Sequence, residues 1–344
     1  MLQPTSAGES ATAAFRLNGN PWARIESEPP AALAISTTLG AIGGSPVTGE
    51  CSDRGRQHRG RGWLGPTLIV GAFAALIIAE RARPLWRETE TKLRRDVWNL
   101  CVAALSAATL RVLERPVVRP LAEIVERRRI GLVQRLGLPR WIEIPLAIVL
   151  MDYTLYVWHV LIHRVPFLWR FHQVHHVDLD LSASTALRFH FGEMALSVPW
   201  RAAQVAIIGT SPRALSIWQD FLFLSVMFHH SNLRLPADWE RLLVRLLVTP
   251  RMHGIHHSIV AEETNSNWSS GLTVWDWLHG TLKLGIPQKA VTIGVAAYRD
   301  ASEVTLPKLV EMPFVEQRPS FLLPSGERPR REPLPGSDLV MPAQ

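Results

Sequence analysis

Cysteine is almost absent from this sequence: Cys51 and Cys101 are the only two in 344 residues. This excludes a disulfide framework, and neither cysteine lies near a group of histidines, so a thiolate metal site is excluded as well. Lysine is also scarce, and the net charge of +7 comes mainly from arginine. The basic residues flank apolar runs instead of forming one stripe, which favours contact with anionic lipid over nucleic acid.

Two motifs of common metalloenzymes are missing too. The chain has no His-Glu-x-x-His motif, which supplies the ligands and the general base of many zinc hydrolases. It also has no Glu-x-x-His pairs, which soluble diiron bundles use. Neither terminal region contains a recognisable haem domain.

Both ends of the chain have the composition of tails. Residues 1–62 are rich in Ala, Ser, Thr, Gly and Pro and have no periodicity, no apolar core of signal-peptide type and several acidic residues. We expect a basic, disordered N-terminal tail there. Residues 285–344 are Pro-rich and charged, and we expect an extended, weakly structured tail.

Between the tails, long apolar runs predict membrane helices. Trp63–Ala79 contains no charged residue and is long enough to span a bilayer, and the shorter Val97–Leu110 fits a tilted span, an interfacial helix or part of a hairpin. The basic stretch after it predicts a surface helix around residues 121–135. Three further apolar segments are Ile144–His163, Met194–Ser211 and Ala214–Phe228. The pattern predicts an all-α, multi-pass membrane protein, with N-terminal helices over 63–140 and further helices over 141–284.

Histidine is concentrated at the ends of these runs. His159 and His163 close one apolar segment, and His172, His175 and His176 follow directly. The spacing of this second motif recurs in His253, His256 and His257. Residues three or four apart share a helix face, so each motif directs two or three imidazoles to one point. Eight imidazoles exceed what one metal needs, and two metals fit the number better.

The order of the segments allows all these histidines to meet. If Met194–Ser211 and Ala214–Phe228 form an out-and-back hairpin, then His229 and His230 return to the side on which His190 lies. His253–His257 then lie on the same side of the membrane, and the chain between His230 and His253 does not have to cross it again. Basic residues flank the second apolar run on both sides, so charge does not decide which side faces the cytosol.

Carboxylates near the histidines are candidates for orienting them, because a metal-bound His normally donates its other N–H to a neighbouring acceptor. By placement these are Asp152, Asp178, Glu193 and Asp276. Asp152 lies two helical turns from His159, about 10 Å along the axis, so a direct bond between the two is not expected. It could instead hydrogen-bond a neighbouring helix.

Several motifs together resemble one family. The stretch from Asp152 to Asp178, then TALRFHFGE, FHHSNLRLP, VTPRMHGIHHS and NWSSGLTVWDWLHGT, are similar in content and order to the fatty acid hydroxylase/sterol desaturase superfamily of membrane non-haem diiron oxidoreductases. The similarity covers roughly residues 68–284, and it implies a catalytic domain over residues 141–284. It implies that His190 and His230 are further metal ligands or near-ligands and that Asn232 and Asn267 orient ligands. His229 and His279 match the family's motifs less well.

The resemblance also implies the chemistry. Two non-haem irons, which zinc can replace in purified protein, would use O2 to hydroxylate or desaturate a C–H bond of a membrane lipid. Electrons would come from a separate ferredoxin- or cytochrome-type donor with its reductase, and such carriers favour a site on the cytosolic face. Sterol, fatty acyl, sphingoid, carotenoid and ether-lipid substrates all remain open.

Two other functions compete with this one. A zinc-dependent membrane hydrolase acting on a lipid would need a carboxylate base beside its ligands, and the number of histidines also disfavours it. A non-catalytic membrane protein that keeps the metals for structure or assembly is the second alternative, against which the intact motifs argue.

Overall fold

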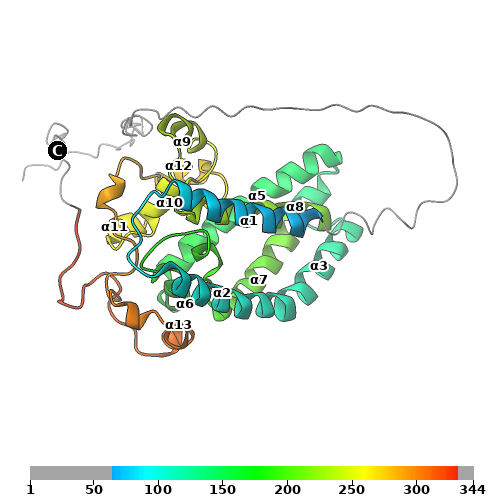
Figure 1. The fold of residues 1–344 in the computed structure, drawn as a ribbon. Coiled ribbons are helices and arrows are strands. Elements are labelled where there is room, and N and C mark those ends of the chain that lie inside the picture. Colours follow the sequence, from blue (N-terminus) through cyan, green and yellow to red (C-terminus); the bar gives the residue numbers. More distant parts are fainter. Residues whose placement is uncertain (1–63, 332–344) are drawn as a thin grey trace, which may run out of the picture.

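Helices make up the architecture of the computed structural model, which describes residues 64–331 (Figure 1). Within those residues there is no extended strand, only isolated bridges such as Pro84 with Leu233. The predicted all-α class is confirmed for this part of the chain. The expected N-terminal tail lies outside the described residues.

The long helices pack against one another in a bundle. They are α1 (Leu64–Ala82), α2 (Lys92–Thr109), α3 (Arg115–Arg128), α5 (Arg140–Arg164), α7 (Phe191–Ile208) and α8 (Pro212–His230). Five residues in π-helical geometry, η2 (Leu110–Glu114), join α2 to α3, just before Pro116 and Pro120. Because proline cannot donate a backbone hydrogen bond, a local change of helix geometry is expected there.

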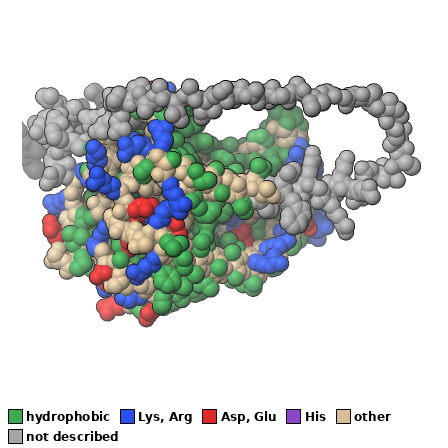
Figure 2. All heavy atoms as spheres, in the orientation of Figure 1, with side chains coloured by type: hydrophobic (Ala, Val, Ile, Leu, Met, Phe, Trp, Pro, Cys, Tyr) green, Lys and Arg blue, Asp and Glu red, His purple; other side chains and the backbone are tan. Residues whose placement is uncertain are grey.

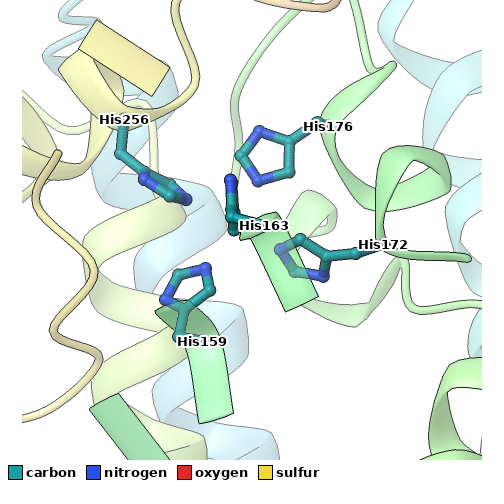
Figure 3. Close-up of side chains that lie close together, drawn as sticks. All are labelled: His159, His163, His172, His176 and His256. Carbon is teal, nitrogen blue, oxygen red and sulfur yellow. The ribbon is translucent and has the colours of Figure 1, made fainter. Parts of the chain in front are cut away.

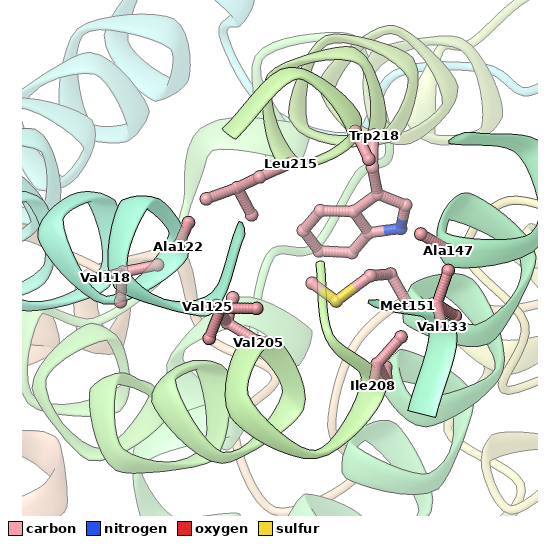
Figure 4. Close-up of a cluster of buried hydrophobic side chains, with 11 residues drawn as sticks. Val118, Ala122, Val125, Val133, Ala147, Met151, Val205, Ile208, Leu215 and Trp218 are labelled. Carbon is pink, nitrogen blue, oxygen red and sulfur yellow. The ribbon is translucent and has the colours of Figure 1, made fainter. Parts of the chain in front are cut away.

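The hydrophobic core of the bundle lies between α3, α5, α7 and α8 (Figure 4). Val118, Ala122 and Val125 of α3 face Met151 of α5 and Trp218 of α8 in this core. The surface helix predicted at residues 121–135 therefore has the wrong bounds, and its buried face was not anticipated. The helix ends at Arg128, with left-handed Arg129 after it, and one apolar face is buried despite the many arginines.

Two glycines allow the far end of the bundle to close. Gly131 follows α3 and Gly209 links α7 to α8, and both have positive φ angles, 87° and 83°. A Cβ added at Gly131 would lie 2.4 Å from the backbone of Gly209, so these two turns touch. The α7–α8 hairpin predicted from the apolar runs is present, and both of its open ends lie near other histidines.

Short helices gather at the other end of the bundle (Figure 1). We call this region the cap. Its elements are α6 (Pro166–His176), η3 (Thr185–Leu187), α9 (Ala237–Leu243), α10 (Pro250–His256), α11 (Ala261–Thr264), α12 (Val274–Leu278), η4 (Gln288–Ala290), η5 (Ala301–Glu303), α13 (Leu306–Glu311) and η6 (Met312–Phe314). The four-residue α4 (Leu132–Arg135) lies at the opposite end, before α5.

The described C-terminal segment differs from the expected weakly structured tail. Residues 291–312 bury Val295, Tyr298 and Leu309 against Val174 and Val177 of the α6 region. Its prolines start or flank short helical turns, where their fixed φ is tolerated, and do not keep the chain extended. Residues 332–344 lie outside the described part.

The surface divides in the same way as the fold. Figure 2 shows charged side chains concentrated over the cap and a largely hydrophobic surface over the adjoining long helices. Leu68, Val70 and Ile78 on α1 are among the large apolar side chains that are exposed. By length and composition, two described stretches could cross a membrane: residues 92–135 and 140–164. Multi-pass topology remains a prediction.

Candidate metal centre

A proline sets the turn that brings the first two histidine motifs together. Val165, which precedes Pro166, is extended, as residues before proline generally are, and it ends α5. Pro166 then starts α6 at a position where no N–H is needed. The chain reverses there, so His172 of α6 lies against His159 and His163, with ring centroids 5.2 and 4.9 Å away.

Nine histidines form two neighbouring groups whose ligand nitrogens lie within 4.8 Å of one another inside each group. Group 1 contains His159, His163, His172, His176 and His256 (Figure 3). Group 2 contains His175, His230, His253 and His257. The two are adjacent: the rings of His176 and His257 stack with their centroids 4.2 Å apart.

Each three-histidine motif is divided between the two groups. On α6, His172 and His176 belong to group 1 and His175 to group 2. At α10 the division is reversed, since His253 and His257 belong to group 2 and His256 to group 1. The expectation that each motif serves one point is therefore confirmed for His159 and His163, which both belong to group 1, and wrong for the two three-histidine motifs. The two histidines that are four residues apart face one group. The histidine between them faces the other group, because it lies about 100° around the helix axis from the histidine that follows it.

In group 2 the Nε2 atoms converge. His230 Nε2 lies 2.9 Å from His175 Nε2 and 3.0 Å from His253 Nε2, and His253 Nε2 lies 3.1 Å from His257 Nε2. His230 Nδ1 donates to the carbonyl of Val226 at 2.8 Å, which leaves its Nε2 as an acceptor. Several ring nitrogens at such short separation are arranged as they would be around one cation.

In group 1 the backbone fixes the orientation of the rings. His159 Nδ1 lies 2.6 Å from the carbonyl oxygen of Trp268, and His256 Nδ1 lies 2.8 Å from that of Ser266. His172 Nδ1 instead lies 3.0 Å from Glu193 Oε1. With Nδ1 donating in each case, the Nε2 lone pair is left free to bind a metal.

The donor set fits metal ions. Buried Nε2 atoms of His163, His172, His176 and His256 have no hydrogen-bond partner among the described residues. Buried polar atoms are otherwise almost always paired, so this group of unpaired nitrogens favours a missing ligand. Burial also lowers the pKa of His176, His256 and His257 well below the usual value, which keeps these imidazoles neutral. The two groups and the histidine chemistry imply a metal site.

A cavity of about 640 Å³ begins at these histidines and runs between the long helices. His159, His172, His175, His230 and His253 line one end of it. Most of its wall is apolar and comes from α2, α5, α7 and α8, including Leu155, Trp158, Ile162, Met194, Leu222 and Val226. The metal groups therefore face an elongated, mainly hydrophobic space.

His190 is the one predicted ligand that lies in neither group. It caps α7: its Nδ1 accepts from the backbone N–H of Gly192 at 2.9 Å, and its Nε2 lies 3.1 Å from the carbonyl of Val310. Both ring nitrogens are thus occupied by the protein. His190 is therefore not among the metal ligands that we propose.

Four of the residues predicted to orient the metal ligands hold backbone segments instead and make no observed hydrogen bond to any of the nine histidines: Asp152, Asp276, Asn232 and Asn267. Asp152 accepts from Leu272 N–H and Trp275 Nε1, at 3.0 and 2.7 Å. Asp276 accepts from the N–H groups of Trp268 and Ser269, both at 2.9 Å.

The two asparagines act in the same way. Asn267 donates to the carbonyl of Met252, next to His253, at 2.9 Å. Asn232 accepts from Leu85 and Trp86 N–H at 2.9 and 2.7 Å, and so fixes the segment between α1 and α2. These four side chains position the loops around the histidines through hydrogen bonds to backbone groups and do not bond to the ring nitrogens themselves.

Of the other two carboxylates, Glu193 contacts a histidine and Asp178 does not. Asp178 is buried between Arg95 and Arg188, with N–O distances of 3.8 and 3.3 Å. Burial opposes its ionisation, but the two arginines outweigh this and lower the pKa of Asp178. Arg95 and Arg188 were not anticipated, since a buried arginine has no distinctive sequence pattern.

Two further histidines lie near the groups. The His229 ring is buried 4.0 Å from that of His253, between centroids, and it lines the cavity. Its neighbour His230 was the only sequence signal for it. His279, in contrast, stacks on Tyr156 with ring centroids 5.0 Å apart and takes no part in either group.

Residues 144–281 match the family model for fatty acid hydroxylase. Among curated relatives, the ornithine lipid hydroxylase OlsE of Rhizobium tropici is 29% identical over 46% of this chain and 46% of its own length. The alkylglycerol monooxygenase of Xenopus tropicalis is 28% identical over 40% of this chain and 29% of its own length. The cholesterol 25-hydroxylase of Rattus norvegicus is 27% identical over 46% of this chain and 52% of its own length. No solved structure gives a significant match.

The described residues thus combine a helical fold with two buried groups of histidines that line a mainly apolar cavity. Residues 144–281 are therefore similar to the fatty acid hydroxylase family, and the relatives named here are hydroxylases and a monooxygenase. The resemblance to this family that the motifs predict is confirmed for that region. The chain spans about half or less of the length of these relatives, so their substrates do not transfer directly.

Proposed function

We propose that this protein is an O2-dependent non-haem diiron oxidoreductase that hydroxylates or desaturates a C–H bond of a membrane lipid. The observation that carries the proposal is the pair of histidine groups at one end of an apolar cavity. Group 1 would hold one iron and group 2 the other. When bound, the irons would supply activation of O2 and oxidation of the C–H bond.

The protein's own part is binding, orientation and exclusion of water. The carbonyls of Trp268, Ser266 and Val226 and the carboxylate of Glu193 hold four rings with Nε2 directed at the metals. Neutral histidines leave the positive charge of two metals largely uncompensated, and Glu193 is the carboxylate that contacts a ligand directly. The apolar wall around Leu155, Ile162 and Val226 would exclude water and align a hydrocarbon chain beside the irons.

The ligand-bearing ends of α5 and α8 and the cap lie together at one end of the bundle (Figure 1). We propose that this end faces the cytosol, where a separate electron donor with its reductase would reach the cap. The lipid would enter the cavity from the bilayer. The proposal includes no nucleic-acid partner.

The first test is metal content per chain, measured by elemental analysis of detergent-purified protein that has been handled without oxygen. We expect about two irons in the wild type, in line with the two groups. His175→Ala removes a group 2 ligand and His256→Ala a group 1 ligand, and each should abolish lipid oxidation while membrane insertion is unchanged. His279→Ala is the matched control, because this histidine is exposed and belongs to neither group.

A single zinc that persists after growth with added iron would overturn the diiron proposal and favour a zinc-dependent hydrolase. Full turnover by His175→Ala or His256→Ala would equally contradict the assignment of the ligands.

A further inference from the structure

The second end of the cavity contains polar side chains in an otherwise apolar part of the bundle. Arg201 of α7, Glu114 of η2 and Gln219 and Asp220 of α8 line the same space as the histidines. Ionisable groups within membrane helices are costly and usually paired or functional. The proposed iron ligands make no use of these residues.

Arg201 is the unusual member of this set. Its Nε and Nη1 atoms are buried and have no hydrogen-bond partner among the described residues. The guanidinium lies over the ring of Trp218, with Cζ 4.2 Å from the ring centroid, and no described carboxylate forms an ion pair with it. Stacking on the tryptophan ring stabilises the cation. It does not provide a hydrogen-bond acceptor for the N–H groups, which point outward in the plane of the guanidinium. A buried guanidinium with free donors that lines a cavity favours an acceptor supplied by a ligand.

Glu114 complements it with acceptors. Its carboxylate lies on the same cavity and accepts from Gln219 Nε2 at 3.3 Å. The guanidinium of Arg201 can only donate hydrogen bonds, and the carboxylate of Glu114 can only accept them. Both line the same cavity, so together they suit a ligand group that can accept and donate, such as a hydroxyl. A second carboxylate, Asp220, lines this end too, which disfavours an anionic ligand. An uncharged group is also less costly to bring into this apolar region than a charged one.

The separation of the two ends sets the length of the ligand. On α7, Arg201 lies eight residues after Glu193, which contacts His172, a separation of about 12 Å along the helix. On α8, Trp218 lies twelve residues before His230, or about 18 Å. Trp218 lines the cavity and also belongs to the hydrophobic core between α3, α5, α7 and α8 (Figure 4).

We propose that Arg201, with Glu114, binds a hydroxyl group of the lipid substrate and so selects the carbon that faces the histidines. Arg201 is thus a specificity-determining residue. The inference rests on the proposed function, because it takes the histidine end as the place of oxidation. The substrate it defines is an elongated lipid with an alcohol oxygen roughly 12–18 Å from the carbon that is oxidised.

Binding of matched probes tests this without turnover. Dodecan-1-ol, dodecane and dodecanoic acid would be titrated into the purified full-length protein in detergent, with quenching of tryptophan fluorescence by a brominated competitor as the readout. We expect the alcohol to bind more tightly than the alkane. Arg201→Met should weaken alcohol binding roughly tenfold or more, the value of a hydrogen bond to a charged group, and leave alkane binding unchanged.

Two variants keep the result interpretable. Arg213→Met makes the same substitution at an exposed arginine of α8 outside the cavity and should bind all three probes as the wild type does. Glu114→Gln retains the size of the side chain and should weaken alcohol binding even if Arg201→Met does not fold.

Equal loss of alcohol and alkane binding in Arg201→Met would show a merely structural arginine and overturn the proposal. Tighter, Arg201-dependent binding of dodecanoic acid would overturn the choice of a hydroxyl in favour of an anion. Metal content measured on the same samples separates the two proposals: protein without iron that still shows Arg201-dependent alcohol binding contradicts the oxidase function and not this inference.

Discussion

At the scale of single residues, the orientation of each histidine depends on what its second ring nitrogen contacts. Three of the rings use backbone carbonyls, which no side-chain substitution removes directly. His172 depends on a side chain, because its Nδ1 faces Glu193. Glu193 is therefore the position at which ligand orientation can be changed by one mutation.

Glu193→Ala should lower metal affinity about 10–100-fold, the usual effect of removing a group that orients a metal ligand. Glu193→Gln keeps a carbonyl acceptor for His172 Nδ1 and should lose less. Metal per chain after dialysis against a graded chelator measures both. Exposed Glu123→Ala on α3 is the control, and a Glu193→Ala variant as resistant to chelation as this control would contradict the role of Glu193.

Asp178 gives a second prediction, and it concerns stability. It is fully buried between Arg95 and Arg188 and accepts from Asn99 and Thr185 at 3.2 and 2.8 Å. Removing one partner from such a network leaves uncompensated charges, so Asp178→Ala should cost about 3–5 kcal/mol of folding free energy. The exposed pair of Asp238 and Arg241 is the control, and Asp238→Ala should cost at most about 1 kcal/mol.

Thermal unfolding in detergent, followed by circular dichroism, compares the two alanine variants. If Asp178→Ala unfolds at the same temperature as Asp238→Ala, the buried network does not stabilise the fold.

At the scale of elements, the loop between α11 and α12 acts as a support for group 1. The carbonyls of Ser266 and Trp268 meet His256 and His159, and Asp276 holds the N–H groups of Trp268 and Ser269 from the other side. Asp152 ties the next residues of the loop to α5. No ring of group 2 has an observed hydrogen bond to this loop, and the one observed ring-to-backbone hydrogen bond of group 2, from His230 to Val226, lies within α8.

Asp276→Ala should therefore release the loop and weaken group 1 selectively. We expect about one metal per chain in place of two, with the retained metal in group 2. Asp300→Ala is the matched control, because Asp300 is an exposed aspartate that also accepts from a backbone N–H, that of Ser302. Loss of both metals together, or of neither, would contradict the separate support of the two groups.

The same elements show what could be predicted from the sequence and what could not. Spacing alone singled out His159, His163 and both three-histidine motifs, because i, i+3 and i, i+4 neighbours share a helix face. It could not show that each motif is divided between two groups, since that depends on how α6 and α10 face each other across the site. The cap function of His190 was missed for a similar reason: its partner Val310 lies 120 residues away.

At the scale of the whole molecule, composition identified the helical class and the apolar runs, but it misjudged two polar segments. The arginine-rich α3 buries Val118 and Val125, and the Pro-rich segment after residue 285 buries Val295 and Leu309. In both, a few apolar residues at the right positions outweigh the average composition. Averages over a window do not contain this information.

The length of α5 leads to the last prediction. Arg140 lies nineteen residues before His159, about 29 Å along the axis, which matches the hydrocarbon thickness of a bilayer. The histidine end and the end that contains Arg128 should then lie on opposite sides of the membrane. After replacement of Cys51 and Cys101 by serine, Lys289→Cys places a thiol on the cap and Arg128→Cys one at the far end, both at exposed positions.

With a membrane-impermeant maleimide, we expect Lys289→Cys to be protected in intact cells and labelled in inverted vesicles, and Arg128→Cys to behave in the opposite way. The reverse pattern would place the histidines on the outer face, away from cytosolic electron carriers. Labelling of both positions from one side would mean that α5 does not cross the bilayer. Since His159 and His163 end this helix, such a result would also require the lipid to reach the cavity by a path other than entry between the long helices.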